Sequence, residues 1–312
     1  EPARGGPMFS QGFAGLKPPF LILETGQPVA SMRRHGRFPH WIRVAAGLRA
    51  DEAVVVNVEQ GEPLPAREGF AGVLVTGSGA MVTERRDWSE RAAEWLREAA
   101  HEGMPLFGIC YGHQLLAHAL GGEVGDNPAG REMGTVDIAL HPHAGEDPLF
   151  AGLPPVFAAQ ATHLQTVLRA PAGATVLAQS VHDACHAFRW GERAWGVQFH
   201  PEFSATHMRG YVHAREEALA GEGHCPKRLA RGGSRLQSSL ARISAGAARL
   251  SSGGVRASTG AGRLSAGLAR LDAGAGELAV GVGRLQSGAN DLSDGLSSGA
   301  TRSEDLVSGV QR

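Results

Sequence analysis

The sequence is poor in cysteine, in net charge and in long apolar runs. Its three cysteines among 312 residues, Cys110, Cys185 and Cys225, are an odd number at wide spacing. That spacing does not fit a disulfide framework and indicates a reducing cytoplasm. The formal net charge of −1 gives no bulk attraction to nucleic acid or to an anionic membrane. No apolar run approaches the roughly 18–20 residues that cross a bilayer, and the N-terminus lacks the charged-then-apolar order of a secretory signal. We therefore expect a cytoplasmic protein with no membrane segment and no nucleic-acid partner.

Short apolar runs alternate with helix-period segments in the first part of the chain. Strands are predicted at 19–26, 51–58, 69–79 and 104–110, and helices at 40–48, 87–103 and 112–120. Apolar strands separated by helices are typical of a parallel sheet covered on both faces. Residues 124–200 instead hold short strand patterns joined by glycine and proline turns, and 204–220 has helical spacing. The pattern predicts an α/β fold, a three-layer and mostly parallel sheet with a β-rich second half.

The last part of the chain carries a seven-residue repeat. One apolar series is Leu236, Ile243, Leu250, Ala257, Leu264, Leu271, Leu278, Leu285 and Leu292. A second small or apolar series lies four residues later, and a glycine series runs at the same period from Gly246 to Gly295. The spacing predicts a long helix pair or bundle. Each glycine opposes a helix by about 1 kcal/mol relative to alanine, so the segment is either closely packed helix or disordered when alone.

These patterns divide the chain into four parts. We expect a disordered N-terminal extension at 1–17, a catalytic or binding domain at 18–220, a linker at 221–235 and the heptad segment at 236–312. The heptad segment resembles the glycine-bearing stalks of phage-infection-protein-type bacterial membrane proteins. It is treated as an accessory or fused segment that could drive self-association.

Cys110 lies between two glycines in the stretch "GICYGHQ". A strand, a turn and a helix with glycine two residues before and after the central residue form the nucleophile-elbow pattern. The elbow lifts the sulfur above the sheet edge, and the start of the following helix favours a thiolate. The alternative is a buried, inert cysteine, and the pattern alone leaves it open.

A thiolate nucleophile needs a base, and "GVQFHPEF" supplies His200 at the end of an apolar strand, with Glu202 two residues later. In a strand, residues two apart point the same way. The carboxylate of Glu202 could therefore hold the imidazole of His200 and leave its other nitrogen for the sulfur. Alone, the histidine could be a strand-end residue beside a solvated glutamate. Together with the elbow, it predicts a Cys-His-Glu triad.

Two stretches, "PLFGICYGHQLLAHALGG" and "WGVQFHPEF", closely resemble the class I, or triad, glutamine amidotransferases. The similarity covers about residues 18–215 and is strongest to stand-alone GMP-synthase-like glutaminase domains. It includes the "VTGSGAMVTE" loop, "GREMG" at 130–134 and "THLQTV" at 162–167. The resemblance implies a flavodoxin-like sheet. It also implies that Cys110 attacks the γ-carboxamide of glutamine, that His200 acts as base and then acid, and that Glu202 orients His200.

The resemblance also assigns an oxyanion hole and a substrate pocket. The oxyanion donors would be the N–H of Tyr111 and an N–H of the "TGSG" loop, where the family usually has Gly-Gly-Pro; we assign Ser78, with Gly77 as its neighbour. Gln114 matches a family glutamine that lines the pocket. Thr162 and His163 match a Ser-His loop that contacts the amino-acid end of glutamine, with threonine as a departure from the family pattern.

Three functions remain open. The chain could be a glutamine amidohydrolase that delivers ammonia to a separate synthetase, because no ammonia-accepting domain is visible in its own sequence. It could be a γ-glutamyl peptidase that uses the same triad without a partner. It could also be a catalytically silent scaffold assembled through the heptad segment.

No cofactor and no metal are expected. His182, Cys185 and His186 lie close together in "HDACH", but a zinc site usually needs four ligands. A turn between two strands is the simpler interpretation.

Overall fold

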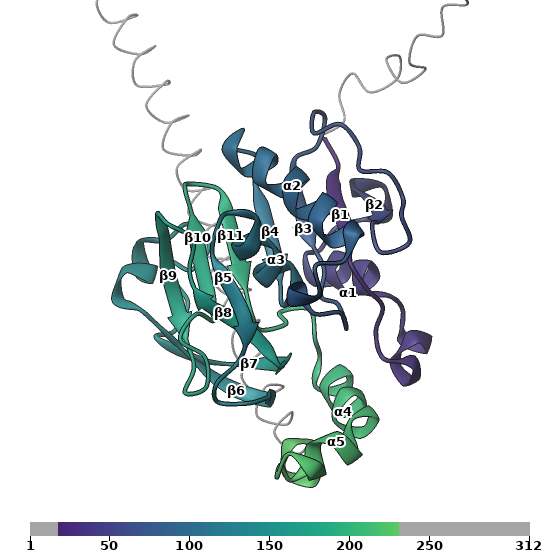
Figure 1. The fold of residues 1–312 in the computed structure, drawn as a ribbon, viewed down its shortest axis with the longest axis vertical. Helices are drawn as coiled ribbons and strands as arrows, with labels where there is room; N and C mark the ends of the chain where they lie inside the picture. Colours follow the sequence, from purple (N-terminus) through teal and green to yellow (C-terminus); the bar gives the residue numbers. More distant parts are fainter. Residues whose placement is uncertain (1–17, 231–312) are drawn as a thin grey trace, which may run out of the picture. The chain divides into compact units, whose positions relative to one another are not determined.

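The computed structural model describes residues 18–230 (Figure 1). The N-terminal extension and the predicted heptad segment lie outside the described residues, so these parts, their boundaries and self-association stay predictions. Within residues 18–230, no helix is long and apolar enough to cross a membrane.

The first part of the chain forms the parallel half of a 9-stranded sheet with the order β2–β1–β3–β4–β11–β10–β9–β6–β7. Its parallel strands are β1 (Phe20–Glu24), β2 (Ala53–Asn57), β3 (Gly72–Val75), β4 (Leu106–Ile109) and β11 (Ala194–Val197). Leu21, Ile22 and Leu23 are fully buried, as expected for a strand covered on both faces. All the strands predicted in this part are present, with shorter bounds.

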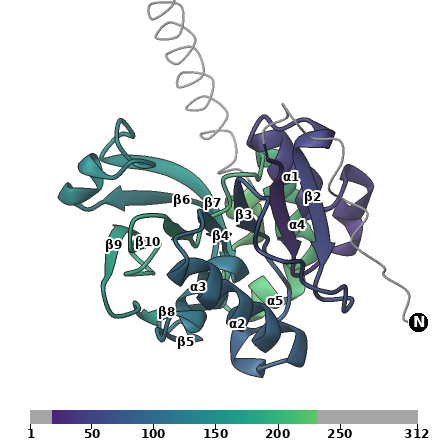
Figure 2. The same cartoon turned by 90° about the horizontal axis from the view of Figure 1, so that it is seen from above.

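Helices cover both faces of these strands. Strand residues alternate between faces, and Leu106 packs in the cluster that holds α2 (Asp87–His101) and α3 (Tyr111–Ala119), whereas Ile109 packs with α1 (Phe38–Ala45). Figure 2 shows α2 and α3 on one side of the strands and α1 on the other. The expected three-layer α/β fold is confirmed. Short 3₁₀ segments complete this half and the next one: η1 (Ala30–His35), η2 (Ala50–Glu52), η3 (Val82–Glu84) and η4 (Pro142–Glu146).

The second half is β-rich, as expected. The remaining strands of the large sheet pair antiparallel: β10 (Ala187–Trp190), β9 (Ala174–Gln179), β6 (Glu132–Leu140) and β7 (Val156–His163). A separate antiparallel pair, β5 (Glu123–Asp126) with β8 (Gln165–Arg169), was not predicted. Both strands are short and end in charged or amide side chains, so they lack a clear apolar alternation.

The predicted helical stretch at 204–220 is two helices, α4 (Ala205–Ala214) and α5 (Glu216–Gly221). Arg215 is both the last cap of α4 and the first cap of α5, so it occupies the break between them. α4 packs through Met208, Tyr211 and Val212 against an aromatic cluster that includes Trp41 of α1. This packing fixes the position of the helix break relative to the sheet.

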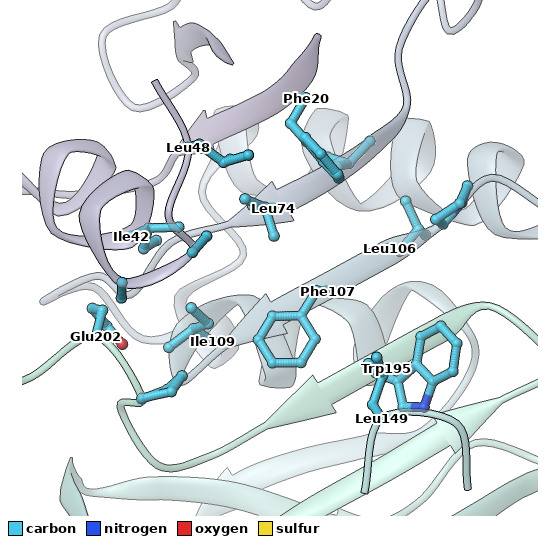
Figure 3. A pocket seen from close by; sticks show the side chains of 15 residues that line it. Phe20, Ile42, Leu48, Leu74, Leu106, Phe107, Ile109, Leu149, Trp195 and Glu202 are labelled. Carbon is cyan, nitrogen blue, oxygen red and sulfur yellow. The ribbon is translucent and has the colours of Figure 1, made fainter. Parts of the chain in front are cut away.

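An apolar groove of about 480 Å³ lies on the α1 face of the sheet (Figure 3). Its walls include Ile42 of α1, Leu74 of β3, Phe107 of β4, Trp195 of β11 and Leu149. We call it the sheet groove. Of the site residues predicted from the sequence, all of which the structure describes, only Glu202 lines it. Cys110, the predicted nucleophile, therefore does not line the sheet groove.

Candidate active site

Cys110 occupies a strained turn between β4, which ends at Ile109, and α3, which begins at Tyr111. Its φ of 53° and ψ of −99° put a non-glycine residue in a backbone region that is sparsely populated and often functional. The flanking glycines are required by close packing. A Cβ on Gly108 would collide with the carbonyl of Gly112, and one on Gly112 would lie 2.6 Å from the carbonyl oxygen of Val75. The strand–turn–helix geometry is that of a nucleophile elbow.

The backbone around Cys110 leaves one N–H group available. The N–H of Cys110 donates to the carbonyl of Val197 at 2.8 Å, and that of Gly112 donates to Thr76 at 3.2 Å. The N–H of Tyr111 has no backbone acceptor outside its helix in the part of the chain that the structure describes, and as the first helical residue it has none within the helix. The Tyr111 ring is buried, and its hydroxyl lies 2.6 Å from Oγ of Ser89, which anchors the turn. An N–H at this place suits an oxyanion donor.

His200 and Glu202 form a buried pair. Nδ1 of His200 lies 2.7 Å from Oε1 of Glu202, and both side chains are almost fully buried. The contact was predicted, but the strand argument behind it is wrong. β11 ends at Val197, His200 makes only an isolated bridge to Gln160 of β7, and Glu202 lies in the turn that follows. The turn, not strand alternation, brings the carboxylate beside the imidazole.

The second ring nitrogen of His200, Nε2, is buried without a hydrogen-bond partner among the described residues. His200 and Cys110 line the same cavity, and a Cβ on Gly77 would lie 3.1 Å from Cε1 of His200 and 3.8 Å from Cβ of Cys110. The Cys110 sulfur itself makes only a long contact, 3.9 Å, to the carbonyl oxygen of Thr162. No formed hydrogen bond joins sulfur and imidazole, which is common in free enzymes, where such contacts tighten when substrate binds.

The electrostatics of this pair favour a thiolate beside an imidazolium. Burial would raise the pKa of the Cys110 thiol, but His200, with help from His163, outweighs burial and holds that pKa below its ordinary value. Burial would lower the pKa of His200, but Glu202 and Cys110 outweigh it and raise the pKa to about 10. The two shifts have one cause, the attraction between the charged forms of neighbouring groups. A thiolate is the reactive form of cysteine.

Two small cavities flank the sulfur and share Ser78, Gly79, Cys110, Thr162 and Arg215 as walls. The first, about 40 Å³, also has Tyr111, Gln114 and His163 in its wall, and we call it the Gln114 cavity. The second, about 140 Å³, has His200 in its wall, and we call it the His200 cavity. Together with Gly77, which contacts His200 from the neighbouring turn, the structure gathers the predicted oxyanion and substrate residues around one sulfur.

The predicted substrate residues are held by specific contacts. The side-chain amide nitrogen of Gln114 donates to the carbonyl of Gln165 at 2.7 Å and to Oε1 of Gln198 at 2.9 Å. Thr162 faces the sulfur with its carbonyl, while its hydroxyl accepts a 2.6 Å hydrogen bond from Arg215. These contacts fix the orientation of both side chains. Their roles in binding glutamine stay predictions.

The ring of His163 is bound to the protein on both sides. Nδ1 donates to the carbonyl of Gln165 at 3.0 Å, and Nε2 donates to Oε2 of Glu132 at 2.9 Å. A histidine that donates through both nitrogens is an imidazolium, and the hydrogen bond to Glu132 raises the pKa of His163 against the opposing effect of burial. His163 therefore places a fixed positive charge near Cys110, and its predicted contact with substrate would have to be made by other atoms than its ring nitrogens.

Glu132 is the centre of a buried polar cluster that sequence analysis did not identify. Its Oε2 accepts hydrogen bonds from His163 and, at 2.6 Å, from His186, and its Oε1 accepts one from Ser180 at 2.7 Å. The three ionisable groups lie close enough to hold a metal ion, but Nε2 of each histidine is already at hydrogen-bond distance from Glu132 Oε2. His182 of "HDACH" is exposed, and Cys185 is buried with its pKa raised by burial to about 12. The "HDACH" stretch is the turn between β9 and β10. His186 joins this cluster, and so does Asp183, whose Oδ2 lies 3.9 Å from Nε2 of His163.

Replacement of Glu132 with alanine should lower the free energy of unfolding by about 3–5 kcal/mol, because it leaves buried histidines without their carboxylate. Burial would raise the pKa of Glu132, but hydrogen bonds from His163 and His186 hold that pKa far below its ordinary value, so the charged form is the one that stabilises. Urea denaturation measures the change. Glu146→Ala, at an exposed position, should change stability by no more than about 0.5 kcal/mol. Equal effects of the two variants would contradict a structural role for the cluster.

Arg215 and Arg131 also line the Gln114 cavity, and sequence analysis missed both. Arg131 lies in the "GREMG" stretch, which by itself assigns it no place in the pocket, and no motif or spacing marks Arg215. Arg215 lies in a helix break at the end of the chain segment that follows His200, and only the fold brings it to the sulfur.

Comparison with known proteins identifies the family of the chain. A family model described as "Glutamine amidotransferase class-I" matches residues 41–216. A glutamine-hydrolysing GMP synthase subunit from Methanopyrus kandleri is 32% identical over 190 residues, which are 60% of this chain and 96% of that protein. The glutamine-hydrolysing GMP synthase of Aeropyrum pernix is 38% identical over 146 residues, 47% of this chain and 26% of that protein. The chain thus spans only about a quarter of that relative's length.

The chain is also similar to a hydrolase of another γ-glutamyl amide and to a solved amidotransferase structure. A γ-glutamyl-L-1-hydroxyisopropylamide hydrolase from a Pseudomonas species is 29% identical over 189 residues, 58% of this chain and 61% of that protein. The crystal structure of a glutamine amidotransferase from Methylobacillus flagellatus superposes with a TM-score of 0.54 at 27% identity, over 65% of this chain and 77% of that one. The matched family model covers more than half of the chain and contains the elbow, the His-Glu pair and most of the residues that line both cavities. The chain therefore belongs to the class I glutamine amidotransferase family.

Proposed function

We propose that this chain hydrolyses the γ-carboxamide of glutamine and supplies the ammonia to a synthetase on another chain. One observation carries the proposal: a cysteine in a strained elbow lies beside a buried histidine whose other nitrogen is held by a glutamate. This arrangement is a nucleophile with a base and an orienting acid. Cys110, His200 and Glu202 take those three roles.

The reaction runs in two steps. The Cys110 thiolate attacks Cδ of glutamine, and the tetrahedral oxyanion collapses as the C–N bond breaks. His200 gives its Nε2 proton to the departing nitrogen, which leaves as ammonia. Water then attacks the γ-glutamyl thioester while His200 takes its proton, so that glutamate leaves and the thiolate returns.

The oxyanion would be bound by the N–H groups of Tyr111 and Ser78. The N–H of Tyr111 points from the first turn of α3 without a backbone acceptor in the described chain. Ser78 lines both cavities beside the sulfur, and its side chain accepts a hydrogen bond from the N–H of Ala80 at 3.1 Å, which stabilises the loop. Loss of one such donor typically costs about 2.7–4 kcal/mol in the barrier.

The similarity to the Methanopyrus kandleri GMP synthase subunit supports a synthetase of that kind as the acceptor. The purified chain should release ammonia and glutamate from glutamine in equal amounts. Addition of the synthetase chain with its own substrates should increase glutamine turnover, and ammonia should appear in GMP. Ammonium and glutamate assays, with and without that chain, measure this. Equal turnover with and without it, and no GMP formed, would exclude this acceptor and leave a glutaminase.

A second function is favoured by the similarity to the Pseudomonas γ-glutamyl amide hydrolase. The same triad would then cleave γ-glutamyl amides other than glutamine without an acceptor. The ratio of kcat/KM for glutamine and for γ-glutamyl alkylamides distinguishes the two functions.

We assign the chain to the cytoplasm, because its three cysteines are unpaired, as is usual in a reducing compartment.

A further inference from the structure

Arg215 places a guanidinium group at the wall that both cavities share. The residue lies at the break between α4 and α5 and lines the Gln114 cavity and the His200 cavity together with Cys110. Its Nη1 donates to Oγ1 of Thr162 at 2.6 Å, and its Cζ lies 5.2 Å from the centre of the Tyr211 ring. These two contacts fix the direction of the side chain.

Within residues 18–230, no carboxylate lies within 4 Å of the Arg215 guanidinium. Arg131, which lines the same cavity, differs in this respect. Arg131 forms a two-pronged ion pair with Glu222, at 2.8 and 3.0 Å. Glu222 is therefore already paired. Burial, and then the repulsion from Arg131, lower the pKa of Arg215. Arg215 is partly buried, and a cation that is partly removed from water without an anion is unfavourable. A guanidinium has five N–H donors, and one of those of Arg215 is bonded to Thr162.

We propose that Arg215 binds the α-carboxylate of the γ-glutamyl substrate whose γ-amide carbon reacts with Cys110. The inference rests on the proposed function, because it concerns the same site. Thr162 connects the two ends: its carbonyl oxygen lies 3.9 Å from the sulfur, and its hydroxyl holds the guanidinium. A substrate of glutamine length, with its reacting carbon about 3–3.5 Å from the sulfur, can reach across this one residue to the guanidinium.

This assignment defines the substrate class. The site should accept γ-glutamyl compounds that carry a free α-carboxylate and should discriminate against those in which that carboxylate is neutral. A planar guanidinium matches a carboxylate with two parallel hydrogen bonds. The neutral analogue would leave the partly buried charge of Arg215 unpaired.

The experiment compares glutamine with its α-carboxamide, L-glutamine amide, as substrates for wild type and Arg215→Gln. Arg215→Gln should lower kcat/KM for glutamine by about 10- to 150-fold, the range for a hydrogen bond to a charged group. It should change kcat/KM for the α-carboxamide less than about 3-fold, because that substrate has no carboxylate that could form an ion pair with Arg215. Arg209→Gln, on the exposed side of α4, is the matched control and should change neither value.

A purely structural role would lower activity on both substrates equally, and that result would overturn the inference. If Arg215→Gln does not fold, Arg215→Lys keeps the charge but loses the fork. It should then show a loss of about 10-fold on glutamine alone.

Binding separates this inference from the proposed function. Calorimetry with the Cys110→Ala variant, which cannot form a thioester, should show glutamine binding that is about 10- to 150-fold weaker after Arg215→Gln is added. If wild type turns over glutamine but Arg215→Gln is unaffected, the inference fails and the function stands. If wild type releases no ammonia but binding depends on Arg215, the function fails and the inference stands. With neither turnover nor binding, both fail.

Discussion

Cys110→Ala should lower glutamine turnover by about 10⁴-fold or more, because removal of a covalent nucleophile leaves only binding and the oxyanion donors. Ammonia release measures the loss. The variant should still bind glutamine, since the side chain removed is small and lies in a turn whose geometry is set by Gly108 and Gly112. It should also resist labelling by glutamine-like electrophiles such as diazo-oxo-norleucine.

The matched control for this prediction is Cys225→Ser. Cys225 is an exposed free cysteine, and its replacement should leave turnover and labelling unchanged. Turnover retained by Cys110→Ala would overturn the thioester mechanism. Labelling of Cys225 in place of Cys110 would show that exposure, not a lowered pKa, decides reactivity in this protein.

His200→Asn should lower turnover by about 10⁴-fold and should also change how Cys110 reacts with pH. In wild type the Cys110 pKa lies below its ordinary value because of His200. The thiolate fraction rises as pH rises through that pKa, so alkylation at neutral pH should be faster than that of an ordinary cysteine thiol. Without His200, burial dominates, the pKa of Cys110 increases, and alkylation at neutral pH should slow and then climb steeply towards alkaline pH.

Alkylation rates with a small haloacetamide, measured from mildly acidic to alkaline pH, test this prediction. His213→Asn is the control, because His213 also lies near a glutamate, with Nδ1 3.5 Å from Glu216, but its side chain is 82% exposed. It should reproduce the wild-type profile. An unshifted profile in His200→Asn would mean that the imidazole does not stabilise the thiolate, and the triad assignment would lose its electrostatic basis.

The parallel half of the fold could be predicted because its inner strands are buried on both faces, although the edge strand β2 is partly exposed. Leu21, Ile22 and Leu23 form a continuous apolar run, which is a strong local signal. The strands β5 and β8 could not be predicted. Their pairing joins segments far apart in the chain, and neither strand has a periodic apolar pattern. The heptad segment lies outside the described residues and stays a prediction.

The elbow was predictable for a similar local reason. Gly108 and Gly112 are required by contacts that any nucleophile elbow would have, so their spacing is visible in the sequence. The contact between His200 and Glu202 was expected from strand alternation, but a turn makes it. Two geometries that place residues i and i+2 together cannot be separated by spacing alone.

Arg215 and Glu132 show what a single sequence does not contain. The importance of Arg215 lies in the lack of a carboxylate partner within the described chain. That of Glu132 lies in two histidines, His163 at the end of β7 and His186 just before β10, that donate to its carboxylate. Both are properties of distant neighbours. The "GREMG" stretch contains Glu132, but neither that motif nor the residues next to Arg215 indicate these distant neighbours.

The sheet groove and the reactive sulfur are separated by very little protein. Ile109 and Glu202 line the sheet groove. Cys110, which follows Ile109 in the chain, and His200, two residues before Glu202, line the His200 cavity. The apolar groove and the cavity that holds the charged pair are therefore lined by neighbouring residues of the same two chain segments. A molecule bound in the groove would therefore contact residues that adjoin Cys110 and His200, the proposed nucleophile and base.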